Sequence, residues 1–176
     1  MDRYTENTLA FNKQLSLDHI VFAHLEKLEK QTRPDAIVVI GMGGSGLIAD
    51  LLQNLSEYVN VKIPIIPWKD FGLPHLPYAA NPLYLFVSFS GETKEILSGL
   101  KAALDLTAHP LMGIVTGGGT LEKLGKEHQI PLATFPQQDL MPRQATGSMF
   151  YAALGIIKAA LAEITITDAR NAVAPK

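Results

Sequence analysis

Short runs of apolar residues, bounded by glycine, proline or polar residues, recur through the middle of the chain. Each run is too short to form a helix. A continuous β-branched run such as Ile37–Ile40 is typical of a parallel strand that is buried on both faces. The runs predict five strands, which are Ala36–Ile40, Val61–Ile66, Leu83–Ser88, Leu111–Thr116 and Ile130–Phe135.

Helical spacing of apolar residues separates most of the predicted strands. In the last helical segment, Phe150, Leu154, Ile157 and Leu161 lie on one stripe. Strands that alternate with helices form βαβ units, so the pattern predicts an α/β fold with a doubly wound parallel sheet. The predicted helices are Leu47–Leu55, Thr93–Leu106, Leu121–His128 and Gln144–Glu163.

The rest of the chain has weaker patterns. The first thirty residues are predicted to be helical, with Ser16 as an N-cap for the apolar residues of Leu17–Leu28, until Pro34 stops the helix. The segment Pro67–Pro82 has several prolines and no periodicity, which predicts a long loop. A length of 176 residues fits one domain, which we place at 1–164, and residues 165–176 are interpreted as a tail or linker.

Composition and charge narrow the possible functions. Lys and Arg number 15 and Asp and Glu 17, so the net charge is −2, and without a basic run nucleic acid and anionic membranes are poor partners. No stretch approaches the length of a membrane span, and the N-terminus lacks the pattern of a signal peptide. The absence of cysteine excludes disulfides, thiolate catalysis and cysteine-based metal sites, and it fits a cytoplasmic location.

Two unusual loops follow the first and third predicted strands. Gly41–Gly46 reads Gly-Met-Gly-Gly-Ser-Gly, Ser88–Thr93 reads Ser-Phe-Ser-Gly-Glu-Thr, and each leads directly into a predicted helix. Glycine lets the backbone approach a ligand, and the first N–H groups of a helix lack internal partners. With small hydroxyl groups beside them, such turns form anion sites, and phosphate is the usual ligand.

The predicted topology brings these two loops together. In a doubly wound sheet, ligands bind where the strand order reverses, which in the order 2-1-3-4-5 is between strands 1 and 3. Either loop alone is commonly a tight turn or a helix cap. Together they favour a phosphate site, for which the candidate residues are Gly44, Ser45, Ser88, Ser90 and Thr93.

Other motif interpretations compete with this one. Gly41-x-Gly43-x-x-Gly46 also matches the dinucleotide fingerprint, but the acidic residue that this site needs at the end of the second strand is missing, and Asp70 comes only after it. No Gly-Lys-Ser/Thr follows the glycines, which excludes a P-loop. A third Gly-rich turn, Thr116–Thr120, is either another anion-binding helix start or a flexible loop capped by Thr120.

Arg143 is the one arginine between Arg33 and Arg170, and it lies between the fifth predicted strand and the long helix. Pro142 sets its loop at the same edge of the sheet, which makes Arg143 a candidate ligand contact. The five histidines show no metal-ligand spacing, so no metal is expected. No Gly-x-Ser-x-Gly surrounds the loop serines, which argues against a serine hydrolase.

These motifs resemble those of the sugar isomerase (SIS) domain, and in particular the N-terminal half of the bifunctional phosphoglucose/phosphomannose isomerase family. The Ser-Gly-x-Thr loop is common to SIS domains, whereas the Asp-x-x-Leu-Pro and Pro-Arg elements narrow the resemblance to this family. The matching segments, in the order of the family, are Gly41–Gly46, Asp70–Pro74, Ser88–Thr93 and Met141–Arg143.

The resemblance implies a flavodoxin-like, five-stranded, three-layer sandwich that binds a phosphorylated sugar and uses no cofactor. The family's phosphate ligands match Ser45, Ser88, Ser90 and Thr93, and Arg143 matches the arginine that stabilises an enediolate-like intermediate. SIS domains usually associate, which implies a homodimer or association with a second SIS domain.

Two departures from the family limit what the resemblance implies. Glu92 stands where members often carry Asn, and its Ser-Gly-Glu-Thr sequence also occurs in arabinose-5-phosphate isomerases and glucosamine-6-phosphate synthases. The family's glutamate base and ring-opening histidine lie beyond the first SIS domain, so this chain lacks the full catalytic set. We therefore expect the phosphosugar-binding part of an isomerase. The alternatives are a stand-alone phosphosugar-binding regulatory module and an arabinose-5-phosphate isomerase-like protein.

Overall fold

The computed structural model describes residues 2–58, 60–108, 110–137, 140–164 and 166. At its centre is a six-stranded sheet in the order β1-β6-β5-β4-β2-β3. β1 pairs antiparallel with β6, and the other neighbouring strands pair in parallel. The strands are β1 (Val21–Ala23), β2 (Ala36–Gly41), β3 (Ile65–Trp68), β4 (Pro82–Ser88), β5 (Leu111–Thr116) and β6 (Leu132–Thr134).

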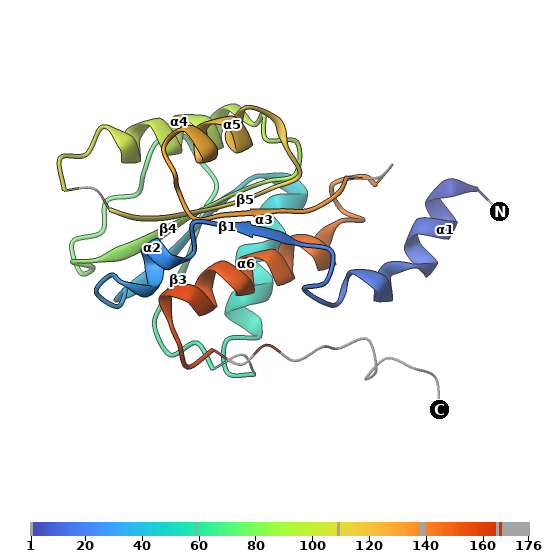
Figure 1. Ribbon diagram of the computed structural model, residues 1–176, viewed down its shortest axis with the longest axis horizontal. Coiled ribbons are helices and arrows are strands. Elements are labelled where there is room, and N and C mark those ends of the chain that lie inside the picture. The colour runs from blue at the N-terminus through green and yellow to red at the C-terminus, as the bar shows by residue number, and fades with distance from the viewer. Residues whose placement is uncertain (1, 59, 109, 138–139, 165, 167–176) are drawn as a thin grey trace.

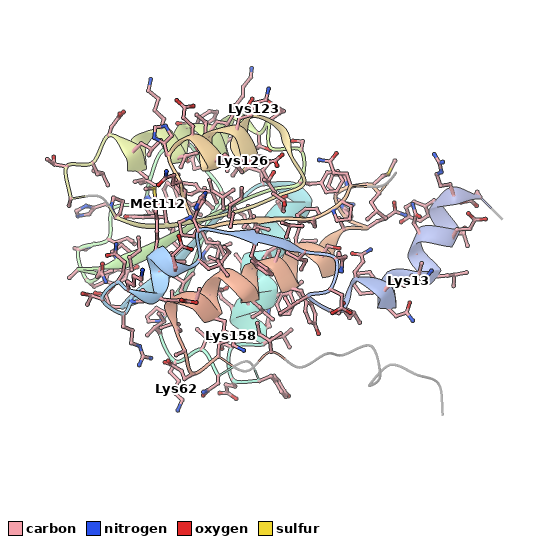
Figure 2. All side chains as sticks on the ribbon, viewed as in Figure 1. Lys13, Lys62, Met112, Lys123, Lys126 and Lys158 are labelled. Carbon is pink, nitrogen blue, oxygen red and sulfur yellow. The ribbon has the colours of Figure 1, made fainter. Side chains whose placement is uncertain are left out.

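Helices cover both faces of this sheet and complete a three-layer α/β sandwich (Figure 1). One outer layer contains α4 (Lys94–Leu104) and α5 (Gly119–Glu127), and the other contains α3 (Gly43–Asn54) and α6 (Thr146–Ala160). Before the first parallel strand come α1 (Arg3–Leu9), the 3-10 helix η1 (Phe11–Gln14) and α2 (Glu26–Glu29). The labelled lysines of α5 and α6, which are Lys123, Lys126 and Lys158, point away from the layers (Figure 2).

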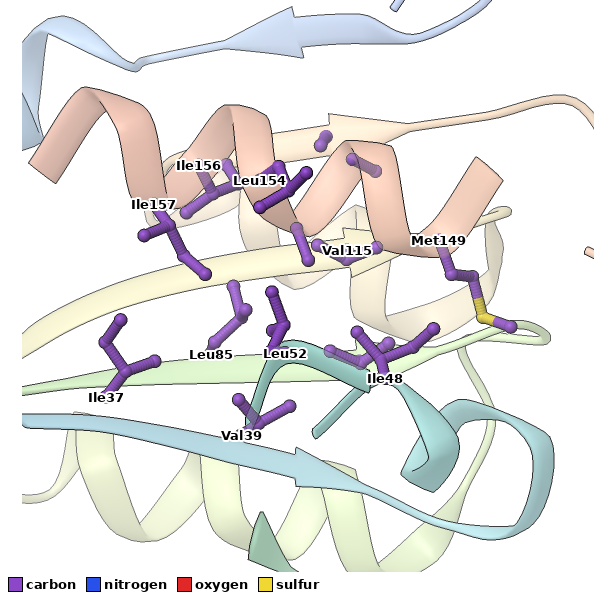
Figure 3. Close-up of a cluster of buried hydrophobic side chains, with 14 of the residues drawn as sticks. Ile37, Val39, Ile48, Leu52, Leu85, Val115, Met149, Leu154, Ile156 and Ile157 are labelled. Atoms are coloured by element: carbon purple, nitrogen blue, oxygen red, sulfur yellow. The ribbon is translucent and has the colours of Figure 1, made fainter. Parts of the chain in front are cut away.

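The core consists of two clusters, one on each face of the sheet. Successive side chains of a strand point to opposite faces, so Ile37 and Val39 pack on the α3/α6 side, while Val38 and Ile40 pack on the α4/α5 side. Figure 3 shows the first cluster, in which α6 residues such as Ile156 meet the strands. The α6 stripe predicted from the sequence is therefore part of the core, and Leu154 and Ile157 are at most 2% exposed.

The predicted doubly wound topology is confirmed. The five parallel strands lie in the order β3-β2-β4-β5-β6, which is the flavodoxin-like order 2-1-3-4-5. The second strand begins later than predicted and continues through Pro67 to Trp68. β3 is at the edge of the sheet, where a proline without an N–H is tolerated because no further strand needs that donor.

The prediction of a helix through residues 17–28 is wrong. The sheet gains a sixth, antiparallel strand there, β1, which pairs Phe22 with Ala133 at the edge of β6. The ring of Phe22 packs so closely on Gly155 of α6 that a Cβ at Gly155 would overlap it. His24, with φ +61°, lies between the end of β1 and the start of α2 and prevents one continuous helix there. Ser16 is not the N-cap of any helix in the described part of the chain. Sheet pairing and the burial of an aromatic ring have outweighed the local helical pattern.

The predicted tail 165–176 lies outside the described residues, apart from Ile166. Along the described part of the chain, no helix combines the length and the apolar character that crossing a membrane requires.

Candidate functional site

The Gly-rich loop joins β2 to α3 with little space for side chains. A Cβ on Gly41 would lie 2.7 Å from the carbonyl oxygen of Ser45, so a larger residue does not fit there. Gly43 begins α3 with φ +53°, a backbone conformation that favours glycine. Met42 is the N-cap and makes no side-chain hydrogen bond to the helix. The first N–H groups of α3 therefore depend on other partners.

The Ser-rich loop joins β4 to α4 and is organised around the buried Ser88. The Gly91 N–H donates to Ser88 Oγ (3.0 Å), and Ser88 Oγ shares a hydrogen bond with Thr93 Oγ1 (2.9 Å). Two hydroxyl groups have two hydrogens, and this pair uses one of them, so one O–H remains for a ligand. Ser90 is exposed, and its hydroxyl accepts from the Glu92 N–H (3.2 Å).

The two loops lie side by side, as the strand order predicts. β2 and β4 are neighbours and pair Gly41 with Val87 at their carboxyl ends. The Phe89 N–H donates to Ser45 Oγ (3.1 Å), which joins the loops directly. The Ser45 hydroxyl in turn points to the sulfur of Met149 (3.5 Å), a weak acceptor. The switch point of the sheet thus brings Gly44, Ser45, Ser88, Ser90 and Thr93 into one region.

Arg143, which lies shortly before α6, is in the same region. A Cβ on Gly44 would lie 3.2 Å from the carbonyl carbon of Pro142 and 3.3 Å from the Arg143 nitrogen, so the Pro-Arg backbone rests on the Gly-rich loop. The Arg143 side chain is exposed, and the Thr146 hydroxyl donates to the Arg143 carbonyl oxygen (2.7 Å). The edge therefore carries a cation beside two helix N-termini.

Glu92 turns away from α4 and binds the start of α5. One of its carboxylate oxygens accepts from the Thr120 N–H (2.7 Å), and both accept from the Thr120 hydroxyl (3.0 and 2.9 Å). These hydrogen bonds from the Thr120 side chain and backbone hold the pKa of Glu92 below its ordinary value. The carboxylate that interrupts the family pattern is thus engaged by the protein itself.

The third Gly-rich turn supports the Ser-rich loop. The Gly117 N–H donates to the Phe89 carbonyl (3.1 Å), and the Leu121 N–H donates to the Gly91 carbonyl (3.0 Å). The interpretation with Thr120 as the cap is wrong, whereas this helix start does bind an anion, which is a carboxylate of the protein itself. Gly118, not Thr120, is the N-cap residue of α5, and Glu92 occupies the position that an external anion would take.

We expect the wild-type protein to be more stable than the variant Glu92→Gln at neutral pH, and to lose this advantage in acid. The glutamine keeps a hydrogen-bond acceptor but has no charge. Because the folded-state pKa of Glu92 is lowered, its contribution is complete above the unfolded-state value near 4.5 and is lost as the pH falls through the folded-state value. Urea unfolding of both proteins between pH 7 and pH 3 measures the difference.

The pH dependence that comes from Glu92 must be separated from that of Asp2, because hydrogen bonds from Thr5 lower the pKa of Asp2 in the same way. The comparison is therefore repeated in an Asp2→Asn background, where the effect of Glu92→Gln should persist. A stability difference that does not change with pH would show that the Glu92 charge contributes nothing at α5.

Lys69 is a second cation at this edge, and our sequence analysis missed it. It directly follows β3, its stem would lie 3.3 Å from a Cβ on Gly46, and its ammonium group pairs with Asp50 (3.0 Å). The signal was present, because Lys69 precedes the matching segment Asp70–Pro74. That segment is anchored to α4, since the Ser98 hydroxyl accepts from the Gly72 N–H (3.3 Å).

Two of the larger hollows of the molecule lie elsewhere. One is between α4 and α5, and the other is bordered by β1, α2 and α6. Both are lined by a mixture of apolar and charged side chains, among them Lys101 and Asp105 in the first and Arg33 and Lys158 in the second. The loops at the switch point instead offer N–H and hydroxyl groups at an edge. Among the described residues, no three His, Asp or Glu side chains come together as a metal ion would require.

By fold, the chain is a flavodoxin-like, doubly wound α/β protein with its candidate site at the switch point of the sheet. Two solved structures share this architecture. The Vibrio vulnificus NanR protein, solved in complex with ManNAc-6P, has a TM-score of 0.57 and 13% identity over 90% of this chain and 60% of its own. The hypothetical protein TT0462 from Thermus thermophilus has a TM-score of 0.54 and 18% identity over 96% of this chain and 45% of its own.

Sequence relatives identify the family. The bifunctional phosphoglucose/phosphomannose isomerase of Aquifex aeolicus is 31% identical over 75% of this chain and 40% of its own length, and that of Pyrobaculum aerophilum is 30% identical over 86% and 46%. A D-glucosamine-6-phosphate 4-epimerase of Sulfolobus acidocaldarius is 29% identical over 58% of the chain. No family model matches. The chain belongs to the bifunctional phosphoglucose/phosphomannose isomerase family and spans less than half the length of these curated relatives.

Proposed function

We propose that the chain binds a phosphorylated sugar at the switch point of its sheet, as the phosphate-holding part of an isomerase of the phosphoglucose/phosphomannose type. The hydrogen bond from Phe89 to Ser45 carries this proposal, because it joins two hydroxyl-bearing helix starts at one edge. The names of the relatives support it, since the isomerases and the epimerase all act on sugar phosphates. We infer that one SIS domain covers residues 1–164 and associates with a second such domain.

The proposed division of labour follows from the positions of the side chains. The N–H groups of the first turn of α4, with Ser88, Ser90 and Thr93, hold the phosphate, and Ser45 and Gly44 close the site from the side of α3. Each hydrogen bond to a charged phosphate contributes about 1.5–3 kcal/mol. Arg143 faces the sugar and stabilises the oxyanion that develops as a proton moves between C2 and C1. The base and the ring-opening acid come from outside this chain.

Calorimetric titration tests the binding step. We expect glucose 6-phosphate or fructose 6-phosphate to bind, and Ser90→Ala to weaken the binding about tenfold, because it removes one hydrogen bond to a charged group. Ser56→Ala, a serine near the opposite end of α3, is the matched control and should bind like the wild type. Absence of heat with any hexose or pentose phosphate would contradict the proposal.

A regulatory module is the second candidate, because a phosphate anchor at the switch point can bind a phosphorylated sugar without catalysing its isomerisation. The two are separated by mixing this chain with the unmatched part of a curated relative. If the isomerase proposal holds, activity appears in the mixture and collapses with Arg143→Ala, while inorganic phosphate still binds. If binding persists and no mixture has activity, the regulatory module is favoured.

A further inference from the structure

The N-terminal arm, which we define as residues 2–20, lies at the margin of the molecule, and its helix α1 stands outside the three layers (Figure 1). α1 buries none of its own residues, and Tyr4 and Leu9 are 62% and 68% exposed. A seven-residue helix without packing is not stable alone in water. Leu15, Leu17 and Ile20 pack the later part of the arm on the core. The position of α1 therefore depends on this part of the arm and on polar contacts that join the arm to the loop that carries Arg143 and to the start of α6.

Gln144, the residue after Arg143, makes the first of these contacts. Its side chain is buried, and the side-chain oxygen Oε1 accepts from the Met141 N–H (3.0 Å). The side-chain nitrogen Nε2 of Gln144 donates to the main-chain carbonyl of Tyr4 in α1 (3.1 Å). One side chain thus closes the turn Met141–Gln144 on itself and ties it to the arm.

Gln14, the last residue of η1, makes the second contact from the arm. Its side chain is also buried, and the side-chain nitrogen Nε2 donates to the main-chain carbonyl of Gln144 (2.7 Å). The side-chain oxygen Oε1 of Gln14 accepts from the Ser148 N–H (3.2 Å) at the start of α6. A Cβ on Gly147 would lie 2.8 Å from the Gln14 Cβ, so glycine at 147 allows this close approach.

The same turn contacts Gly44, where the Pro142-Arg143 backbone rests on the Gly-rich loop. A buried amide is costly unless its hydrogen bonds are made, and each of the two glutamines makes one hydrogen bond to this turn and one to a neighbouring element. Arg143 itself is exposed and long, so its reach toward a ligand is set by the backbone that carries it. A fixed turn reduces the entropy that Arg143 loses when it binds.

Resting on the proposed function, we propose that Gln14 and Gln144 are positioning residues for Arg143. The N-terminal arm holds the turn Met141–Gln144 against the Gly-rich loop, and through it directs the guanidinium group to the sugar.

A double-mutant cycle tests the coupling, with the full chain and glucose 6-phosphate as the probe. Gln144→Met, which keeps the size but removes both polar ends, is expected to weaken binding about fivefold. In an Arg143→Ala background the same change should have no further effect, because Gln144 acts through Arg143. Binding of inorganic phosphate, which does not require Arg143 in the proposed site, should be equal in all four proteins. Additive losses, or no loss with Gln144→Met, would overturn the assignment.

Trypsin provides a readout that does not depend on any sugar. It cleaves after Arg143, and in Gln14→Met the cleaved bond itself is unchanged. We expect cleavage there to become about tenfold faster, since a loosened segment opens more often, while cleavage after the distant, exposed Lys62 keeps its rate (Figure 2). Equal rates at Arg143 would overturn the support role. If the wild type binds no phosphosugar but the protease result holds, the proposed function fails and the support role survives.

Discussion

Replacing Gly91 by alanine is expected to lower the free energy of unfolding by about 3 kcal/mol, the sum of backbone strain and overpacking. Gly91 has φ +71°, in the left-handed region that favours glycine. A Cβ at this position would also overlap the carbonyl oxygen of Gly118, which belongs to the adjacent Gly-rich turn. The Gly91 carbonyl accepts from the Leu121 N–H, and Gly118 is hydrogen-bonded to the Thr116 hydroxyl, so neither backbone can shift cheaply.

The same change should also reduce phosphate binding, because Gly91 N–H holds the hydroxyl of Ser88 in place. Urea unfolding measures the first effect, and calorimetry with inorganic phosphate measures the second. Gly43→Ala is the matched control: Gly43 has a similar positive φ, +53°, but nothing lies within 4 Å of its Cβ position. It should cost only the backbone strain, about 1–2 kcal/mol. Equal losses for the two variants would show that the contact with Gly118 does not constrain the loop.

The parallel part of the sheet was predictable because each of its strands is covered on both faces. Continuous apolar runs such as Ile37–Ile40 have no second interpretation at that length, and the helices between them leave one simple topology. The order of the strands then placed the Gly-rich and Ser-rich loops together, and the Phe89–Ser45 hydrogen bond confirms their contact.

The N-terminal part could not be predicted from local spacing. Leu17, Phe22 and Leu28 all pack toward the body, but from different kinds of structure that tertiary contacts select. The decisive contact, Phe22 on Gly155, joins residues far apart in the sequence, and nothing in either local pattern reveals it. The short strand β1 therefore had the appearance of one turn of a helix.

The candidate site was predictable in its location and less so in its internal contacts. Glu92 illustrates this: the sequence shows a carboxylate in a phosphate-type loop, and only the structure shows that it binds Thr120 of the next helix. The loops at the switch point are therefore coupled to one another. The Gly-rich turn before α5 supports the Ser-rich loop, and the arm supports the turn of Arg143, so substitutions outside the site should change its geometry.

Replacing Phe86 by alanine is expected to have a larger effect on stability than any change in the loops, about 4 kcal/mol. Phe86 is fully buried in β4, between β2 and β5, and its ring lies 3.4 Å from the Cβ position of Gly99 in α4. Truncation removes the apolar contact of the ring and leaves a cavity between the sheet and α4, which limited relaxation cannot fill. A loss of this size is a large part of the roughly 5–15 kcal/mol that stabilises a typical domain.

Because Ser88 is the last residue of β4, we expect Phe86→Ala to weaken phosphate binding as well, under conditions in which the protein is still folded. Phe71→Ala is the matched control, since this ring is 56% exposed and its removal should change the free energy of unfolding by less than about 0.5 kcal/mol. Urea unfolding with unchanged slope measures both variants. A loss at Phe86 as small as that at Phe71 would mean that the layer between β4 and α4 contributes little to the fold. The site would then depend on its own hydrogen bonds and not on the packing beneath it.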